Sequence, residues 1–358
     1  GYYYNQGVIP TQDYGRYSLR GSIEQKINKF VKVGFNTNSN YNFSNGNQIG
    51  VGGILSATPI SDPYNADGSL KRTFKMALDE QFTVTRGVVE NLKDVWLNEN
   101  RGYATYNSLY GEVNIPRVEG LKYRTNLGLD FIQGTSGNYT GEGINNVNPT
   151  TISTAGIANT HTYHWTVENI LSYDRTFAQK HNISAVALYS AEQNKYNRSS
   201  MSAKGIPSDD FMYYNLGQAT GEITVSPDGQ DYQMWGLMSG MGRVMYSFND
   251  RYMASATLRS DGSSRLADGY KWHTYPAVSL GWNIMKESFM IPVTAVSELK
   301  LRVGYGQTSN QAISPYATLG RLSTRPYNFG PTNYAVGYYV STLPNKNLGW
   351  EYSETWNA

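Results

Sequence analysis

One stretch of the chain restricts its fold more than any other. KVGFNTNSNYNF, residues 32–43, lies in a run from Val31 to Phe43 in which side-chain character alternates at every position. Asparagine occupies four even positions, namely Asn36, Asn38, Asn40 and Asn42. A period of two places alternate side chains on opposite faces of a strand. Because globular strands usually have about five or six residues, the run predicts an unusually long strand with one apolar and one hydrated face.

Four further segments repeat this alternation. They begin at Leu121, Tyr163, Val278 and Leu299, and each has apolar residues at one parity and charged, amide or small residues at the other. In the segment that begins at Tyr163, Ile170 is the exception, an apolar residue among polar ones. Gly, Asn, Ser, Thr and Tyr dominate the composition, which favours strands and turns over helices. The chain is therefore predicted to be all-β.

The connections between the predicted strands alternate in length. We expect eleven strands, near 14–24, 31–43, 102–115, 121–133, 161–174, 182–195, 232–247, 252–262, 272–285, 298–308 and 347–358. Long connections lie near 44–101, 134–160, 196–231 and 309–346, with a shorter one near 263–271, and short turns separate them. Antiparallel barrels of outer membranes have short periplasmic turns and long extracellular loops. The pattern predicts such a barrel over residues 1–358, with the long connections outside the cell.

A membrane barrel explains the asparagine strip. The hydrocarbon core would take Val33 and Phe35, the interface would take Tyr41 and Phe43, and the amides would face a wet lumen. An apolar run of roughly 18 residues, as a membrane helix needs, is absent from the sequence. A soluble β-sandwich or solenoid with one solvated face remains the alternative at this point. Both ends of the sequence interrupt strand-like patterns, which suggests a piece of a longer protein.

Composition and motifs argue against several other functions. The net charge is +2 without a long basic run, so nucleic-acid binding has no electrostatic basis. The chain has no Cys and therefore no thiolate chemistry. His161 and His164 would point to opposite faces of a strand, which disfavours a shared metal ion. Phosphate-binding loops and nucleophile elbows are also absent from the sequence. We expect no enzyme, no cofactor and no metal site.

Several strings resemble the barrel of SusC/RagA-type TonB-dependent outer-membrane transporters. The most specific are LRSDGSSR (258–265), KWHTYPAVSLGWNI (271–284), LKLRVGYGQT (299–308) and NLGWE (347–351). RYSLRGSIEQKINKFVKVGFNTNSNYN (16–42) and KGIPSDDFMYYNLGQA (204–219) extend the resemblance over nearly the whole chain.

The resemblance implies a transmembrane barrel of about 22 strands closed by an N-terminal plug. This chain would be about half of that barrel, without the plug and without the segment that contacts TonB. It further implies import of large nutrients, oligosaccharides first, in a Gram-negative outer membrane with a SusD-like surface lipoprotein and membrane lipid as neighbours. A peptide importer of the RagA branch, a passive porin and a soluble glycan-binding β protein remain the alternatives.

Ligand contacts are predicted from residue type and position, because aromatic rings and amides suit sugars or peptides. The lumen-facing candidates towards the long loops are Asn38, Asn40, Asn42, Tyr106, Asp130, His164 and Glu168. The candidates among the loop aromatics are Tyr213, Tyr214 and Trp235.

Overall fold

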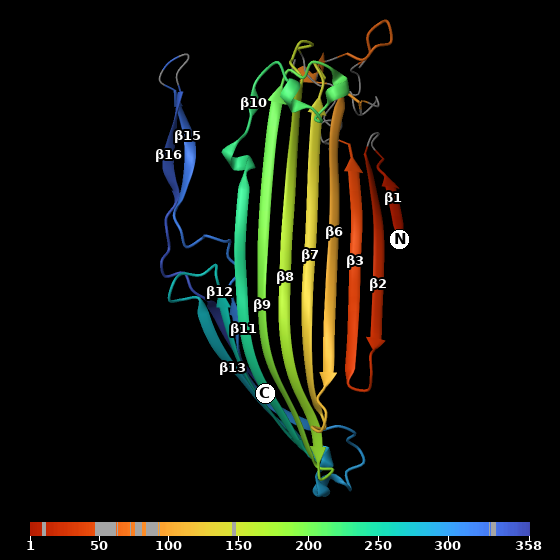
Figure 1. The fold of residues 1–358 in the computed structure, drawn as a ribbon, viewed down its shortest axis with the longest axis vertical. Helices are drawn as coiled ribbons and strands as arrows, with labels where there is room; N and C mark the ends of the chain where they lie inside the picture. The colour runs from red at the N-terminus through yellow and green to blue at the C-terminus, as the bar shows by residue number, and fades with distance from the viewer. Residues whose placement is uncertain are drawn as a thin grey trace.

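The protein is a single broad antiparallel sheet (Figure 1). The computed structural model describes residues 1–8, 12–46, 62, 64–71, 73–75, 81–83, 92, 94–144, 148–328, 330 and 334–358. Within these residues thirteen strands pair in the order β1-β2-β3-β6-β7-β8-β9-β11-β12-β13-β14-β17, and β10 pairs with β9. Strands β1 and β17 form the two edges, so the sheet is an open segment of wall.

The strands of this sheet differ in length, and the longest run from one end of the molecule to the other (Figure 1). Their bounds are β1 Tyr2–Gln6, β2 Asp13–Lys26, β3 Val31–Asn45, β6 Trp96–Asn114, β7 Leu121–Thr140, β8 Thr154–Phe177, β9 His181–Lys204, β10 Ile223–Thr224, β11 Asp231–Phe248, β12 Tyr252–Ser263, β13 Trp272–Asn283, β14 Lys300–Asn310 and β17 Glu351–Asn357. Two hairpins stand outside the sheet, namely β4 Thr73–Lys75 with β5 Gln81–Thr83, and β15 Arg321–Asn328 with β16 Tyr334–Thr342. Short turns gather at the lower end in Figure 1 and long connections at the upper end.

All eleven predicted strands are present, but several are longer than predicted. The β7–β8 and β8–β9 ladders reach Thr140, Thr154 and Lys204, well inside the predicted connections. Strict alternation is weak in these extensions, whereas backbone pairing continues through them. The hairpin β15–β16 occupies part of the predicted connection 309–346. Residues 47–61, 76–80 and 84–91 of the predicted loop 44–101 lie outside the described residues.

Register gives the sheet two chemically different faces. Directly paired residues share a face, and one continuous row joins β2, β3, β6, β7 and β8 through Ile23, Phe35, Leu109, Leu127 and Val167. We call the face that carries this row the apolar face. Its side chains remain exposed within the chain, with 69% exposure for Ile23.

Two groups of aromatic residues border this apolar band. The upper aromatic row consists of Tyr17, Tyr41, Tyr103, Phe131 and Tyr163, and the lower aromatic row consists of Tyr173, Tyr246, Tyr252 and Trp282. On β8 the two rows are ten residues apart, from Tyr163 to Tyr173. At about 3.3 Å per residue and a tilt of about 40° this separation spans roughly 25 Å, the height of the apolar band of outer-membrane barrels.

Polar residues on the apolar face bond to one another. The Thr37 hydroxyl donates to Asn107 Oδ1 at 2.8 Å, and the Asn107 amide donates to the Leu129 carbonyl at 3.2 Å. Ser39 and Thr105 pair through their hydroxyls at 2.8 Å. Since hydrocarbon offers no hydrogen-bond partners, these contacts let the residues lie just below the upper aromatic row.

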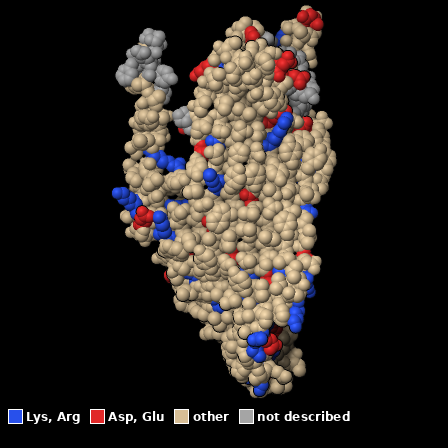
Figure 2. All heavy atoms as spheres, in the orientation of Figure 1, with Lys and Arg blue, Asp and Glu red and all other residues tan. Residues whose placement is uncertain are grey.

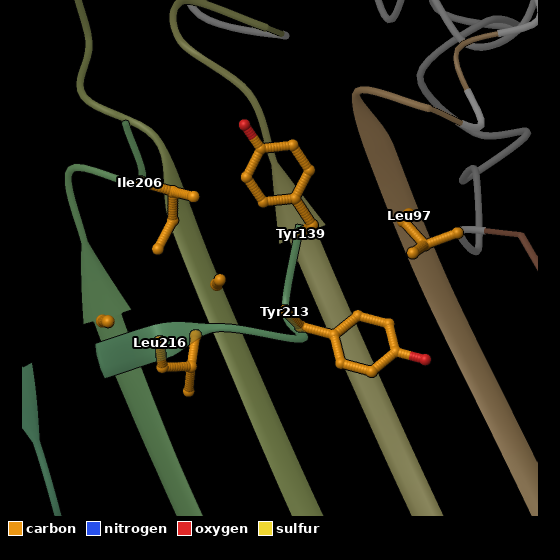
Figure 3. Close-up of a cluster of buried hydrophobic side chains, with 7 residues drawn as sticks. Leu97, Tyr139, Ile206, Tyr213 and Leu216 are labelled. Atoms are coloured by element: carbon orange, nitrogen blue, oxygen red, sulfur yellow. The ribbon is translucent and has the colours of Figure 1, made fainter. Parts of the chain in front are cut away.

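A small cap covers the upper ends of four strands on the apolar face. Its buried cluster consists of Leu97, Tyr139, Ala155, Ala203, Ile206, Tyr213 and Leu216 (Figure 3). The segment after β9 carries Ile206, Tyr213 and Leu216 across the strands, and Tyr139 is fully buried beneath it. Because protein covers the apolar face here, this part of the wall has a partner other than lipid.

The opposite end has a polar anchor in the connection after β13. The side chain of Glu287 accepts hydrogen bonds from the Tyr252 hydroxyl at 2.6 Å, from the Trp282 indole at 3.0 Å and from Arg251 at 3.1 Å. These bonds, the one from Tyr252 foremost, hold the pKa of Glu287 below its ordinary value. Two residues of the lower aromatic row are thus fixed at their polar tips.

Among the described residues, no helix has the length and apolar character needed to cross a membrane.

Candidate functional site

A continuous polar row crosses the face opposite the apolar face, which we call the polar face. Asn38 of β3 pairs with Tyr106, Tyr106 with Asp130, and Asp130 with His164. The register continues from His164 to Asn194 of β9 and then to Trp235 of β11. Five residues predicted separately from the sequence are therefore brought into one row across six strands.

His164 is at the centre of this row and contacts two carboxylates. Its Nδ1 lies 3.0 Å from Asp130 Oδ2, and its Nε2 lies 3.6 Å from Glu192 Oε2. A carboxylate accepts hydrogen bonds, so the Asp130 contact places a proton on Nδ1. All three side chains are between 24% and 28% exposed, which leaves their edges open to a solute.

Trp235 extends the row with a flat apolar surface. Its ring centroid lies 6.4 Å from that of His164 and 3.8 Å from the guanidinium carbon of Arg265. Burial lowers the pKa of Arg265, which lies in the connection after β12, and nearby Glu192 partly opposes that effect. The Nε of Arg265 is buried without a hydrogen-bond partner among the described residues. An indole, an imidazole and a guanidinium thus meet beside two carboxylates.

The other predicted strand residues flank the row on the same face. The Asn126 amide donates to Glu168 Oε2 at 2.9 Å, which places Glu168 nearer the short turns. Asn40 pairs with Ala104 and Asn42 with Gly102. A Cβ atom at Gly102 would lie 2.7 Å from Asn42 Oδ1, so glycine lets this amide lie flat on the sheet. All seven strand residues predicted to bind ligand share the polar face.

The two loop tyrosines differ from each other and lie apart from the row. Tyr213 is 5% exposed, and its hydroxyl donates to Glu99 Oε2 at 2.6 Å. Burial, followed by this hydrogen bond, raises the pKa of Tyr213. Its neighbour Tyr214 is 61% exposed. The expectation that both rings are presented by a loop is wrong for Tyr213, because that ring fills the cap above Gly137.

Sequence reasoning missed three members of the site. Asn194 and Glu192 lie at polar positions of an alternating strand, so their face could have been predicted but their register could not. Arg265 lies beyond β12, and the turn that returns it over Trp235 has no local sequence signal. Ile170 is also explained by register: it pairs with Leu188, which pairs with Met241, and the three make an apolar patch on the polar face.

The described residues contain no group of three or more His, Asp and Glu side chains arranged to hold a metal ion. The row combines rings, amides and carboxylates, which are groups able to contact a polar solute reversibly.

Comparison with known proteins agrees with the two-faced wall. The chain is 28% identical over 364 residues to TonB-dependent receptor P26 of Formosa agariphila, covering 98% of this chain and 34% of the relative. It is 41% identical over 130 residues to TonB-dependent receptor SusC of Bacteroides thetaiotaomicron, covering 34% of this chain and 12% of that protein. The predicted relationship to SusC/RagA-type TonB-dependent receptors is confirmed. A scan of protein-family models gave no match.

Solved structures show the same fold. The RagAB peptide importer in its closed-closed state superposes with a TM-score of 0.77 at 18% identity, covering 96% of this chain and 38% of that chain. Its open-open state gives a TM-score of 0.76 at 19% identity. The chain is thus an antiparallel wall segment of an outer-membrane β-barrel, and receptors of this type are not enzymes.

The chain spans about a third of the length of the curated relatives that it matches along its whole length.

Proposed function

We propose that the chain forms part of the wall of a TonB-dependent importer of oligosaccharides that works with a SusD-like surface lipoprotein. The observation that carries this proposal is the polar row Asn38–Tyr106–Asp130–His164–Asn194–Trp235, which lies opposite an apolar band of membrane height. The polar face lines the lumen, and the long connections lie outside the cell.

The chemistry of the row supports a large polar cargo. Tyr106 is 42% exposed, and with Trp235 it offers flat apolar surfaces for sugar rings. Asn38 and Asn194 supply amides for hydroxyl groups. Contacts of this kind are individually weak, which suits a wall along which a solute must move.

A peptide is the second candidate cargo, and one observation favours it. The row holds charges of both signs at close range, with Asp130 and Glu192 on either side of His164 and Arg265 over Trp235. Peptides carry a cationic and an anionic terminus, whereas neutral oligosaccharides carry neither. The two cargoes therefore differ in their expected dependence on Arg265 and Glu192.

The experiment is a titration of the purified full-length receptor with a neutral oligosaccharide and with a peptide of similar mass. For the oligosaccharide, Trp235→Ala weakens binding about tenfold, because stacking on an aromatic ring is worth about 0.5–1.5 kcal/mol beyond its buried area. Arg265→Gln has little effect on the same cargo. If Arg265→Gln abolishes peptide binding and oligosaccharide does not bind, the cargo is a peptide.

The matched control is Tyr163→Phe, which alters the residue beside His164 on the opposite face. His164→Ala is expected to weaken cargo binding and Tyr163→Phe to leave it unchanged. Equal losses in both variants would contradict a lumenal role for the row. Uptake into cells should stop on addition of a proton uncoupler, whereas continued uptake would indicate a passive porin.

A further inference from the structure

A pocket lies on the apolar face, away from the polar row. It has a volume of about 360 Å³ and is lined by Tyr41, Arg101, Tyr103, Gln133, Thr135 and Tyr214, among others. Tyr41 pairs with Tyr103 and Tyr103 with Gln133, whereas Arg101 pairs with Thr135 one step higher. The five strand residues named here share the face of the apolar band, so the pocket faces away from the lumen.

The height of the pocket is fixed by the upper aromatic row. Tyr41 and Tyr103 belong to both, and Arg101 lies two residues beyond Tyr103 on β6, away from the hydrocarbon. Aromatic rows mark the membrane interface, and the next layer outward is the headgroup layer. With the long connections outside the cell, as proposed above, that layer belongs to the outer leaflet.

The pocket lies within the wall and not at its open edge. Its strand residues come from β3, β6, β7 and β8, and the sheet continues past them on both sides. The two edges of the sheet are β1 and β17, and β2 separates β1 from the pocket on one side. The cap bounds the pocket from above through Tyr213 and Tyr214.

The chemistry of the pocket combines one cation with several rings. Arg101 Nη2 lies 3.0 Å from Glu99 Oε2, an oxygen that also accepts the hydroxyls of Tyr213 at 2.6 Å and Tyr214 at 3.4 Å. With this contact to Glu99, 48% of the Arg101 side chain remains exposed. A guanidinium has five N–H donors in a planar fork that matches a phosphate. Tyrosine rings suit sugars, and Gln133 and Thr135 add hydrogen-bonding groups.

We propose that this pocket binds the phosphorylated sugar headgroup of a glycolipid in the outer leaflet. Arg101 contacts the phosphate, and the rings of Tyr41, Tyr103 and Tyr214 contact the sugar. The acyl chains extend below along the band that begins with Phe131 and Leu129. The inference uses the orientation proposed above but does not depend on the cargo.

The test is a titration of the full-length receptor in detergent with a bisphosphorylated glycolipid disaccharide. Arg101→Gln weakens binding about tenfold or more, since hydrogen bonds to charged groups contribute about 1.5–3 kcal/mol. Removal of the phosphates from the lipid causes a similar loss with the unaltered receptor and little further loss with Arg101→Gln. The matched control is Arg198→Gln, which removes an arginine at the same height on the polar face and leaves lipid binding unchanged.

Three outcomes would overturn the proposal. If Arg101→Gln and the unaltered receptor bound the lipid with equal affinity, the proposed contact between Arg101 and the phosphate would be wrong. An equal loss in Arg198→Gln would show that charge, and not this pocket, determines binding. Competition by inorganic phosphate at the same concentration as the lipid would indicate a free-anion site. Cargo binding measured on the same samples separates this test from that of the import proposal, because Arg101→Gln is expected to retain it.

Discussion

Both the cap and the apolar face of the wall carry large apolar side chains, but these side chains have different surroundings in the two regions. In the cap, Leu97, Tyr139 and Leu216 are buried by other parts of the chain (Figure 3). In the wall, Ile23 and Leu280 are 69% and 66% exposed. In Figure 2, charged side chains are sparse over the middle of the visible face and gather toward its ends and edges. The two regions sit on the same strands and the same face, about eight residues apart on β8.

The difference shows that exposure has to be judged against the surrounding solvent. Above the upper aromatic row the strands stand in water, so apolar residues need a protein cover, and the cap supplies it. Below that row lipid covers them, and Val167 or Leu280 needs no neighbour from the chain. Neither the fully buried Tyr139 nor the exposed Ile23 therefore leaves apolar surface in contact with water. Substitutions that separate these two environments test the comparison.

The largest effect is expected in the cap, from Tyr139→Ala. Truncation of a fully buried large aromatic residue costs about 3–5 kcal/mol. Here the loss lowers the free energy needed to open the cap away from the strands. Proteolysis of the segment 205–222 in the intact receptor should accelerate strongly. Ile144→Ala, in the same region but outside the buried cluster, is the control; equal cleavage of both variants would argue against a packed cap.

An added charge should destabilise the wall on the apolar face but not on the polar face. Val167→Arg places a cation in the middle of the apolar band and is expected to cost about 2–4 kcal/mol near the midplane. Thr166→Arg, its neighbour on the polar face, should change stability far less, because the lumen is wet. Unfolding by denaturant in lipid vesicles measures both. Similar losses for the two variants would contradict the assignment of faces.

A smaller change is expected from Tyr213→Phe, which keeps the ring and removes the hydroxyl. Glu99 then loses one of its three hydrogen-bond donors, at a cost of about 1.5–3 kcal/mol to cap opening. Tyr214→Phe removes a longer contact of 3.4 Å and should have a weaker effect. The proteolysis assay described for Tyr139→Ala compares cap opening in all three variants. If Tyr214→Phe had a larger effect than Tyr213→Phe, the exposed Tyr214 would be the more important hydrogen-bond donor to Glu99.

The smallest effect concerns the anchor at the short turns and depends on pH. Glu287 has a folded-state pKa below its ordinary value of 4.5, so its contribution is present above that value and is lost as pH falls through the lowered pKa. Melting temperature should therefore drop below about pH 4.5 in the unaltered receptor, and less so in Glu287→Gln. Asp250→Asn, which removes the exposed partner of Lys286, is the control and should keep the pH response.

Much of the wall could be predicted from local sequence. Alternation assigned Asn38, Asp130 and His164 to one face before any register was known, because side-chain period in a strand is two regardless of its partners. The same reasoning failed for the upper ends of β7 and β8, where the cap and not lipid covers the apolar face, at Tyr139 and Ala155. It also failed for Tyr213, since the burial of a loop ring depends on the strands that it crosses.

Long strands with one apolar and one hydrated face could be predicted from the amino-acid sequence, because hydrophobic alternation is a property of each strand alone. Three relations became visible in the folded protein: Asn38, Tyr106, Asp130, His164 and Trp235 form a single row, Arg265 returns over Trp235, and Arg101 lies among tyrosines above the apolar band. These relations depend on the pairing register of strands far apart in the chain, and a shift of one residue would have moved every side chain to the other face.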